Sequence, residues 1–427
     1  MKEEGAKPNA RKFLEQVLRG LDYSFESAVA DLVDNSIQAK ASKVDIRIDT
    51  KLLKVFIVDD GQGMDDPTHL EAMKIASETR AYDEDDLGKF GTGMKSASLS
   101  MARKLTVVTR QAGSEPTARI LDLDHVAKAN DWDRLLLVPE IDELVEEVRT
   151  RIPDQSGTLV VWENLRFLDE DSDLATQKRV VSHIDSTEQY LRTVFHRFLE
   201  GSTASGQKVS IKLNGMPMLP WNPFMPDEST KEISQKAVLN FPNGASVTVT
   251  GYVLPAQAEF SSPEAFIEAK GAKSFQDGQG FYCYRNDRLI RTGGWLGVIA
   301  ADPHLSLARL SFEFDSRSDA ILGVNVVKSQ IKLPAALKAK LRQAVSPITA
   351  DAKTRYSAKG RKNAAKVGEL PTRGGGPAVK LPRKHTASEL ATTLVEIAVS
   401  NNLGTELEKI KQAVRDDALT LAQEIGW

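Results

Sequence analysis

The sequence predicts an α/β protein with more than one domain. Its 427 residues exceed the length of one ordinary domain, and 41% hydrophobic against 27% charged residues is the balance of a globular chain with sizeable cores. Alternating apolar residues at Val44, Ile46 and Ile48, followed by the apolar run 53–58, predict two strands. Residues from about 10 to 40 are expected to be helical, with one helix that begins near Ser24 and whose core-facing side is formed by Val29, Leu32, Val33, Ser36 and Ile37 at helical spacing.

The composition excludes several classes of protein. The formal net charge of −3 gives no overall attraction to nucleic acid or membrane, so such a partner would need a local basic patch. Cys283 is the sole cysteine, which excludes a disulfide framework and fits a reducing compartment. The polar segment 1–13 lacks the apolar core of a signal peptide, and no run approaches the roughly 18 apolar residues that span a bilayer. We therefore expect a cytoplasmic protein without a membrane anchor.

The helix that begins near Ser24 carries two polar residues of interest. Asp31 and Asn35 are four residues apart, so they project from the same face. An Asn side-chain oxygen is a suitable ligand for Mg²⁺, and a carboxylate one turn earlier can hold and deprotonate an attacking water. Such pairs are also common on solvated helix faces, so this pattern alone does not identify a site.

A turn of the type Asp-Asp-Gly-x-Gly follows the second predicted strand. It places the carboxylate of Asp59 at the strand end and lets the backbone bend tightly at the glycines that follow. A carboxylate there can accept a hydrogen bond from an exocyclic amine, and a site built on that bond rejects purines that lack it. An ordinary β-turn uses the same residues.

The segment 88–96 places three glycines immediately before a predicted helix. Its backbone amides can approach phosphate oxygens at the helix N-terminus, where Lys95 and Ser96 would add a charge and a hydroxyl. It is not a Walker A loop, because Met94 stands where that motif has Lys. It is not a Rossmann fingerprint either, because Ser96 replaces the third glycine.

The order and spacing of these three segments, with Gly157-Thr158 at a later strand start, resemble the four nucleotide motifs of the GHKL family. That family includes gyrase B, the ninety-kilodalton heat-shock chaperones, histidine kinases and MutL. The resemblance implies a GHKL (Bergerat) α/β sandwich that binds ATP and Mg²⁺, with the metal on Asn35, adenine on Asp59 and Thr158 supporting that Asp. The glycine-rich segment would form the hinge of a lid over the phosphates. The residues assigned to the nucleotide are Asn35, Asp59, Gly61, Gly63, Met64, Gly88, Gly91, Thr92, Gly93, Met94, Lys95, Ser96 and Thr158.

The general base of the family is a Glu four residues before the metal-binding Asn, and Asp31 occupies this position. Its side chain is one methylene shorter, so the carboxylate lies farther from the γ-phosphate and hydrolysis is expected to be slow or lost. Glu26 lies on a different side of the helix and is a poor substitute.

The resemblance continues into a second domain and covers roughly residues 10–346. The segments 251–255, 280–295 and 324–334 are similar to the transducer domain of MORC-type ATPases and their bacterial relatives. In such transducers a loop Lys contacts the γ-phosphate, and Lys328 is the matching position. The resemblance implies that ATP closes a dimer through the N-terminal region. The polar residues Arg285, Asn286 and Arg288 are expected to hold a domain interface or a partner.

We therefore expect four regions. They are a GHKL domain (1–204), an α/β transducer domain (205–346), a basic flexible linker (347–386) and a C-terminal helical segment (387–427). Residues 353–384 contain ten Lys or Arg against one Glu, a composition that binds nucleic acid phosphates or serves as a solvated tether. The C-terminal apolar stripe is assigned to packing or dimerisation. A polar flexible loop is expected over residues 65–87.

The first functional hypothesis is a MORC-like ATPase that dimerises on ATP and clamps or remodels DNA. A chaperone-like ATPase acting on a protein client would use the same pocket without DNA affinity. A nucleotide-binding regulator that does not hydrolyse ATP is the third hypothesis, because of Asp31. A histidine kinase is disfavoured by the lack of a phospho-acceptor histidine module before the ATP domain, and a topoisomerase by the lack of a cleavage domain after it.

Overall fold

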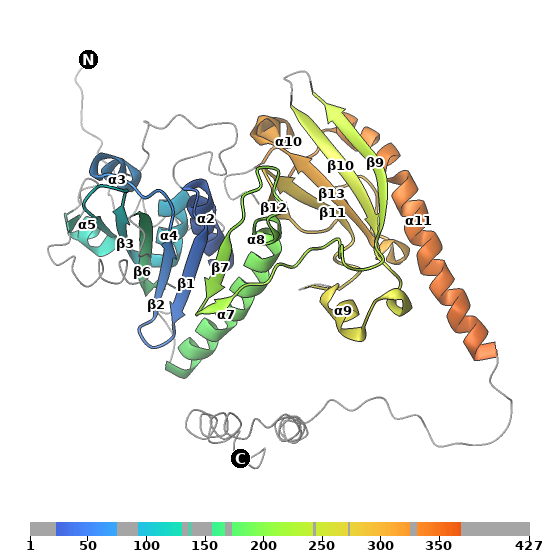
Figure 1. Ribbon diagram of the computed structural model, residues 1–427, viewed down its shortest axis with the longest axis horizontal. Coiled ribbons are helices and arrows are strands. Elements are labelled where there is room, and N and C mark those ends of the chain that lie inside the picture. The colour runs from blue at the N-terminus through green and yellow to red at the C-terminus, as the bar shows by residue number, and fades with distance from the viewer. Residues whose placement is uncertain are drawn as a thin grey trace, which may run out of the picture. The chain divides into compact units, whose positions relative to one another are not determined.

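The computed structural model of the protein describes residues 23–74, 93–129, 136–137, 156–166, 173–241, 245–271, 274–324 and 331–368. Within these ranges, strands form one sheet of eight and one of five, and helices pack against both (Figure 1). The α/β class predicted from the sequence is thereby confirmed.

The first sheet has the strand order β5-β4-β3-β6-β2-β1-β7-β8. Neighbouring strands are antiparallel except β1 and β7, which are parallel. The strands are β1 (Lys43–Asp49), β2 (Lys54–Asp59), β3 (Ala102–Arg110), β4 (Thr117–Asp122), β5 (Leu136–Leu137), β6 (Gly157–Leu165), β7 (Ser210–Leu213) and β8 (Met216–Pro217). Because β7 and β8 pair with this sheet, it extends past residue 204, where the sequence placed the end of the first domain.

Side chains of the central strands are buried on both faces of this sheet. In β2, Val55 and Ile57 belong to the large core that the helices cover, whereas Phe56 and Val58 belong to a smaller cluster on the opposite face. This alternation follows from the two-residue period of a strand. The apolar run that precedes Asp59 therefore holds the end of β2 in place from both sides.

The helices around this sheet are α2 (Phe25–Gln38), α3 (Asp66–Met73), α4 (Gly93–Met101), α5 (Leu123–Ala129), α7 (Asp173–Val194) and α8 (His196–Glu200). Helix α2 begins where the sequence predicts: the Ser24 side chain accepts a hydrogen bond from the backbone N of Ser27 at 3.2 Å. Such a cap satisfies one of the free amides of the first helical turn.

Helix α3 corrects the prediction of a flexible loop from residue 65. Asp65 caps it by accepting from the backbone N of Thr68 at 2.9 Å, and Pro67 stands in its first turn. Both are standard start signals that the polar composition masked. The buried His69 and Met73 then fix the helix to the protein. The rest of the expected loop, residues 75–87, lies outside the described residues.

The second sheet has the order β12-β11-β13-β10-β9, with β11 and β13 parallel and the other pairs antiparallel. Its strands are β9 (Lys231–Asn240), β10 (Ser246–Val253), β11 (Gly280–Arg285), β12 (Arg288–Arg291) and β13 (Ala308–Phe314). The helices in this part are α9 (Pro263–Glu268), α10 (Asp319–Leu322) and α11 (Ala335–Gly368), and short 3₁₀ turns lie at Gln257–Glu259, Pro303–Leu305 and Ser316–Ser318.

Helix α11 corrects the expected start of the linker. It continues through Pro347 to Gly368, so the prediction of a linker is wrong for residues 347–368. Val345 before the proline and Ile348 after it are both buried in the core of the second sheet. This packing compensates for the helix hydrogen bond that proline removes. The remainder of the expected linker and the C-terminal helical segment lie outside the described residues.

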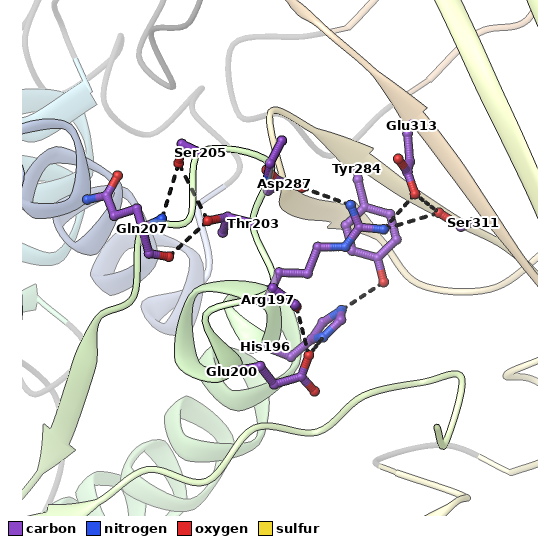
Figure 2. A network of polar contacts seen from close by, with 12 residues as sticks. His196, Arg197, Glu200, Thr203, Ser205, Gln207, Tyr284, Asp287, Ser311 and Glu313 are labelled. Atoms are coloured by element: carbon purple, nitrogen blue, oxygen red, sulfur yellow. Dashed lines mark hydrogen bonds and ion pairs between the residues drawn. The ribbon is translucent and has the colours of Figure 1, made fainter. Parts of the chain in front are cut away.

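Helix α8 meets the second sheet through a network of polar contacts (Figure 2). The Arg197 guanidinium lies over the ring of Tyr284, with 3.8 Å between Cζ and the ring centroid. It also pairs with Asp287 at 2.9 Å and with Glu313 at 2.7 Å. The hydroxyl of Tyr284 lies 2.8 Å from Nε2 of His196. Helix α8 is thereby bound to β11, to β13 and to the β11–β12 turn.

None of the helices in the described ranges is long and apolar enough to cross a bilayer.

Candidate functional site

Asp59 ends strand β2 with a buried carboxylate, only 7% of the residue being exposed. Its Oδ2 lies 2.7 Å from the hydroxyl of Ser36 on α2, and its Oδ1 accepts from the backbone N of Gly61 at 3.0 Å. Burial raises the pKa of the Asp59 carboxyl to about 6, although the hydrogen bonds from Ser36 and Gly61 favour its charged form. A carboxylate offers about four acceptor positions, so Asp59 retains capacity for a further donor.

Both glycines of the turn after β2 are required, because neighbouring atoms leave no room for a side chain. A Cβ on Gly61 would lie 2.8 Å from Cβ of Ala39 and 3.0 Å from Oδ1 of Asp59. Gly63 has a φ of +65°, and a Cβ there would lie 1.8 Å from the carbonyl oxygen of Arg110. Any other residue would collide with backbone at Gly63. At Gly61 a side chain would crowd both the carboxylate of Asp59 and the backbone of Ala39.

A hydroxyl network joins this turn to strands β3 and β6. Thr109 Oγ1 accepts from the backbone N of Met64 at 3.0 Å and lies 3.0 Å from the hydroxyl of Thr158. Thr158 is the register partner of Asp59, and its backbone favours the charged form of that carboxyl. Thr158 therefore supports Asp59 through its backbone, while its side chain bonds to Thr109.

The next residue, Asp60, makes a different set of contacts. Its Oδ1 accepts from the backbone N of Ser42 and of Lys43, at 2.7 Å each, and its Oδ2 accepts from the hydroxyl of Ser42 at 2.6 Å. Asp60 therefore fixes the start of β1. Of the two adjacent aspartates, only Asp59 is buried between β2 and α2.

Asp31 is buried on α2 beside the first residue of α4. A Cβ on Gly93 would lie 3.9 Å from Oδ2 of Asp31. The phenol of Tyr23 donates to the same oxygen at 2.7 Å. Burial and then the negative charge of Asp31 raise the pKa of Tyr23 well above its ordinary value. Tyr23 therefore remains a hydrogen-bond donor and fixes the orientation of the Asp31 carboxylate.

Asn35 follows Asp31 by one helical turn, and its side chain is half-buried. Residues four apart on a helix share a face, so α2 offers a carboxylate and an amide oxygen on one side. Glu26 is directed elsewhere: its carboxylate contacts Ser186 Oγ at 2.6 Å and His183 Nδ1 at 3.2 Å, both on α7. Burial would raise the pKa of Glu26, but these two hydrogen bonds lower it to about 2. Glu26 thus belongs to the contact with α7.

The start of α4 carries three of the residues that the sequence assigns to the nucleotide: Met94, Lys95 and Ser96. Lys95 is buried, and its ammonium donates to the carbonyl of Lys74 at the end of α3. Burial lowers the pKa of Lys95 to about 8. Met94 packs against the large core, and Ser96 is half-buried. The Lys95 ammonium thus contacts the end of α3, and its expected phosphate contact stays a prediction. Gly88, Gly91, Thr92 and Lys328 lie outside the described residues.

Together these contacts define an α/β domain in which one helix and one strand end bring buried polar groups together. Residues 23–158 match the family model described as histidine kinase-, DNA gyrase B-, and HSP90-like ATPase. No curated protein matches the chain. The matched segment contains Asp31, Asn35 and Asp59. It therefore supports the GHKL superfamily and ATP binding for this domain, and it ends before the second sheet begins.

GHKL ATPase domains bind ATP together with Mg²⁺, and the residues present fit both ligands. The Asp59 carboxylate keeps acceptor capacity for an amine beside the hydrogen bonds that it accepts from Ser36 and Gly61. The half-buried amide oxygen of Asn35 is the kind of hard donor that Mg²⁺ prefers.

The sequence motifs did not identify three residues of this site. Ser36 was assigned to the core-facing side of α2, where a hydroxyl is itself a sign of a buried polar partner. Thr109 stands in an apolar strand pattern and carries the same kind of signal. Tyr23 has no local signal, because its partner Asp31 lies eight residues further along.

The buried carboxyl of Asp59 should make the free energy of unfolding depend on pH. Its pKa is about 6 in the folded chain against an ordinary value of 3.8, so folding favours the protonated form. The resulting stabilisation is complete below about pH 4 and is lost as the pH rises through about 6. At about 1.4 kcal/mol for each pKa unit, this amounts to ~3 kcal/mol.

Urea unfolding between pH 4 and pH 7 should show this contribution in the wild type. Asp59→Asn should flatten the pH dependence in that interval, because the amide does not titrate. If the variant keeps the wild-type slope, Asp59 does not carry this pH dependence.

Proposed function

We propose that this chain is a Mg-ATP-binding ATPase of the GHKL type, in which ATP gates a dimeric clamp on DNA, as in MORC-like proteins. The observation that carries the ATP site is the buried Asp59 carboxylate, held between Ser36 of α2 and the turn amide of Gly61. A buried acceptor with unused capacity at a strand end is suited to an exocyclic amine of a purine.

The residues of α2 take separate roles in this proposal. Asn35 would hold Mg²⁺, which when bound neutralises phosphate charge. Asp31 would orient and deprotonate the attacking water. Its carboxylate already accepts from Tyr23 at 2.7 Å, which fixes its direction and uses part of its acceptor capacity. Together with its short side chain, this favours slow turnover.

The gate is proposed to run through the second domain. Lys328 would contact the γ-phosphate, and this contact exists with ATP but not with ADP. A ligand shifts a conformational equilibrium only by its differential affinity for the two states, and this contact provides such a difference. The closed state would be an ATP-dependent homodimer.

The basic character of α11 supports DNA as the partner. The helix contains nine Lys or Arg residues against Asp351 as its sole acidic residue. Lys340 and Lys353 are exposed on it. Cationic side chains along a helix suit a phosphate backbone, to which binding is independent of sequence and sensitive to salt.

Asp59→Asn should weaken the binding of ATP by about 10- to 100-fold, because the amide no longer serves as a charged acceptor for the adenine amine. Isothermal titration calorimetry of the wild type and the variant measures this change. Asp60→Asn is the matched control, since Asp60 is adjacent but contacts Ser42 and Lys43. If the two variants bind ATP with equal affinity, Asp59 is not the residue that binds adenine.

Asp31→Asn should spare ATP binding and reduce turnover by about 100-fold or more, as expected for the loss of a general base. Steady-state phosphate release measures the rate. Glu26→Gln is the control on the same helix, and its rate should equal that of the wild type. An unchanged rate in Asp31→Asn would show that Asp31 is not the base. A wild type that binds Mg-ATP without turnover would favour the non-hydrolysing regulator.

DNA binding should weaken steeply between 50 and 200 mM salt, with a loss of about 10³-fold if some six phosphates are contacted. A non-hydrolysable ATP analogue should strengthen the binding and shift the protein toward a dimer in size-exclusion chromatography. Fluorescence anisotropy with a labelled duplex measures the affinity.

Lys328→Ala should remove the ATP-dependent part of both effects and leave the nucleotide-free affinity for DNA unchanged. A protein that stays monomeric with the analogue would contradict the gate. If the protein does not bind DNA even at low salt, the chaperone-like ATPase that acts on a protein client is favoured instead.

A further inference from the structure

The hairpin formed by β11 and β12 carries two buried arginines with different partners. Its turn residues Asn286 and Asp287 have φ angles of +48° and +64°, the left-handed pair that a two-residue hairpin turn requires. Arg285 and Arg288 flank this turn as register partners. Arg285 stays within the second domain, where its guanidinium binds both carboxylate oxygens of Asp319 at 2.9 and 3.0 Å.

Arg288 instead contacts the nucleotide-binding helix. Its Nε lies 3.2 Å from Oδ1 of Asp34 on α2, and the side chains are 4% and 3% exposed. The guanidinium also lies over the ring of Phe195, at 5.5 Å. Burial alone would lower the pKa of Arg288, but the charges of Asp34 and Asp31 and the hydrogen bond to Asp34 raise it above its ordinary value. The guanidinium is therefore a fixed cation inside the protein.

The position of Asp34 gives this contact its significance. Asp34 immediately precedes Asn35 and follows Asp31 by three residues on the same continuous helix. An α-helix moves as a rigid element, because its backbone hydrogen bonds fix successive residues relative to one another. A displacement of Asp34 therefore displaces both neighbouring side chains.

The hairpin is itself anchored next to Arg288. Asp287 accepts from Arg197 at 2.9 Å through Oδ1 (Figure 2). Its Oδ2 accepts from the backbone N of Ala204 at 2.8 Å. Arg288 thus leaves a turn that is already bound to the first domain. Because Arg288 contacts Asp34, the position of α2 depends on the position of the hairpin.

We propose that Arg288 is a positioning residue of the nucleotide site, which acts through Asp34 to set the metal-binding Asn35. The proposal rests on the function assigned above. It adds a route from the second domain to the metal ligand that does not pass through Lys328. A lysine at position 288 would keep the charge but lose the planar guanidinium that holds a fixed geometry.

The experiment measures the part of the nucleotide affinity that depends on Mg²⁺. Calorimetry gives the Kd of a non-hydrolysable ATP analogue with Mg²⁺ and with a chelator, and the ratio of the two values reports the metal site. Groups that orient a metal ligand typically change metal affinity by 10- to 100-fold when lost, so Arg288→Met should reduce this ratio by about 10-fold or more. Arg288→Lys should recover part of it.

The matched control is Arg285→Met, which breaks an ion pair of equal burial in the same hairpin, made with Asp319 and not with a residue of α2. Each single variant removes the arginine that pairs with a buried carboxylate, so both should lower the Tm. Only Arg288→Met should change the Mg²⁺-dependent ratio. A parallel loss of the ratio in both variants would mean that Arg288 has only a structural role, and the proposal would be overturned.

The double variant Arg288→Met with Asp34→Leu keeps the test decisive if the single variant does not fold. Replacing both charges by apolar groups is compatible with a stable fold. Its Mg²⁺-dependent ratio should still be reduced, because the hydrogen bond that orients α2 is gone. A wild-type ratio in a folded double variant overturns the role of Arg288. A wild type that does not bind the analogue, or binds it without Mg²⁺ dependence, overturns the nucleotide site itself, and this proposal falls with it.

Discussion

Helix α2 is buried around most of its surface, and the polar side chains that it carries must therefore be matched by partners. Asp31, Asp34 and Ser36 are all less than a tenth exposed. An unpaired polar group in such a place costs about 1–3 kcal/mol, and an unpaired charge costs more. The partners come from three places in the chain: Tyr23 before the helix, Arg288 in the second sheet and Asp59 at the end of β2.

This requirement explains why the fold and the site cannot be separated. Each partner that satisfies a polar group on α2 also sets the position of that helix against another element. The contact between Ser36 and Asp59 links it to the first sheet, and the contact between Asp34 and Arg288 links it to the second. The neighbours of the half-buried Asn35 therefore fix the backbone that carries it, because Asp34 binds the second sheet and Ser36 binds the first.

Local patterns were enough to predict much of this arrangement. The N-cap at Ser24, the strand that ends at Asp59 and the tight turn at Gly61 and Gly63 are all encoded within a few residues. The nucleotide site was inferred from the resemblance of these segments, in order and spacing, to the GHKL motifs, because each segment alone also fits an ordinary helix face or turn.

Long-range partners were not predictable in the same way. Nothing in the sequence near Asp34 indicates that its counter-ion lies 254 residues later. The sequence around Lys95 likewise does not indicate a hydrogen bond to the carbonyl of Lys74. Tertiary packing also overrode a local signal at Pro347, where buried side chains on either side carry α11 through a residue that usually ends a helix.

The β1–β2 hairpin determines which of two adjacent aspartates, Asp59 or Asp60, is buried against α2. Its register pairs Val44 with Asp59 and Asp49 with Lys54. Because side chains alternate along a strand, a shift of one residue turns every side chain of β2 to the opposite face. Deleting one residue from the turn between Asp49 and Lys54 would then exchange the apolar contents of the two clusters and turn the Asp59 carboxylate away from Ser36. The length of this exposed turn thus sets whether the Asp59 carboxylate faces α2, although the turn lies at the opposite end of β2.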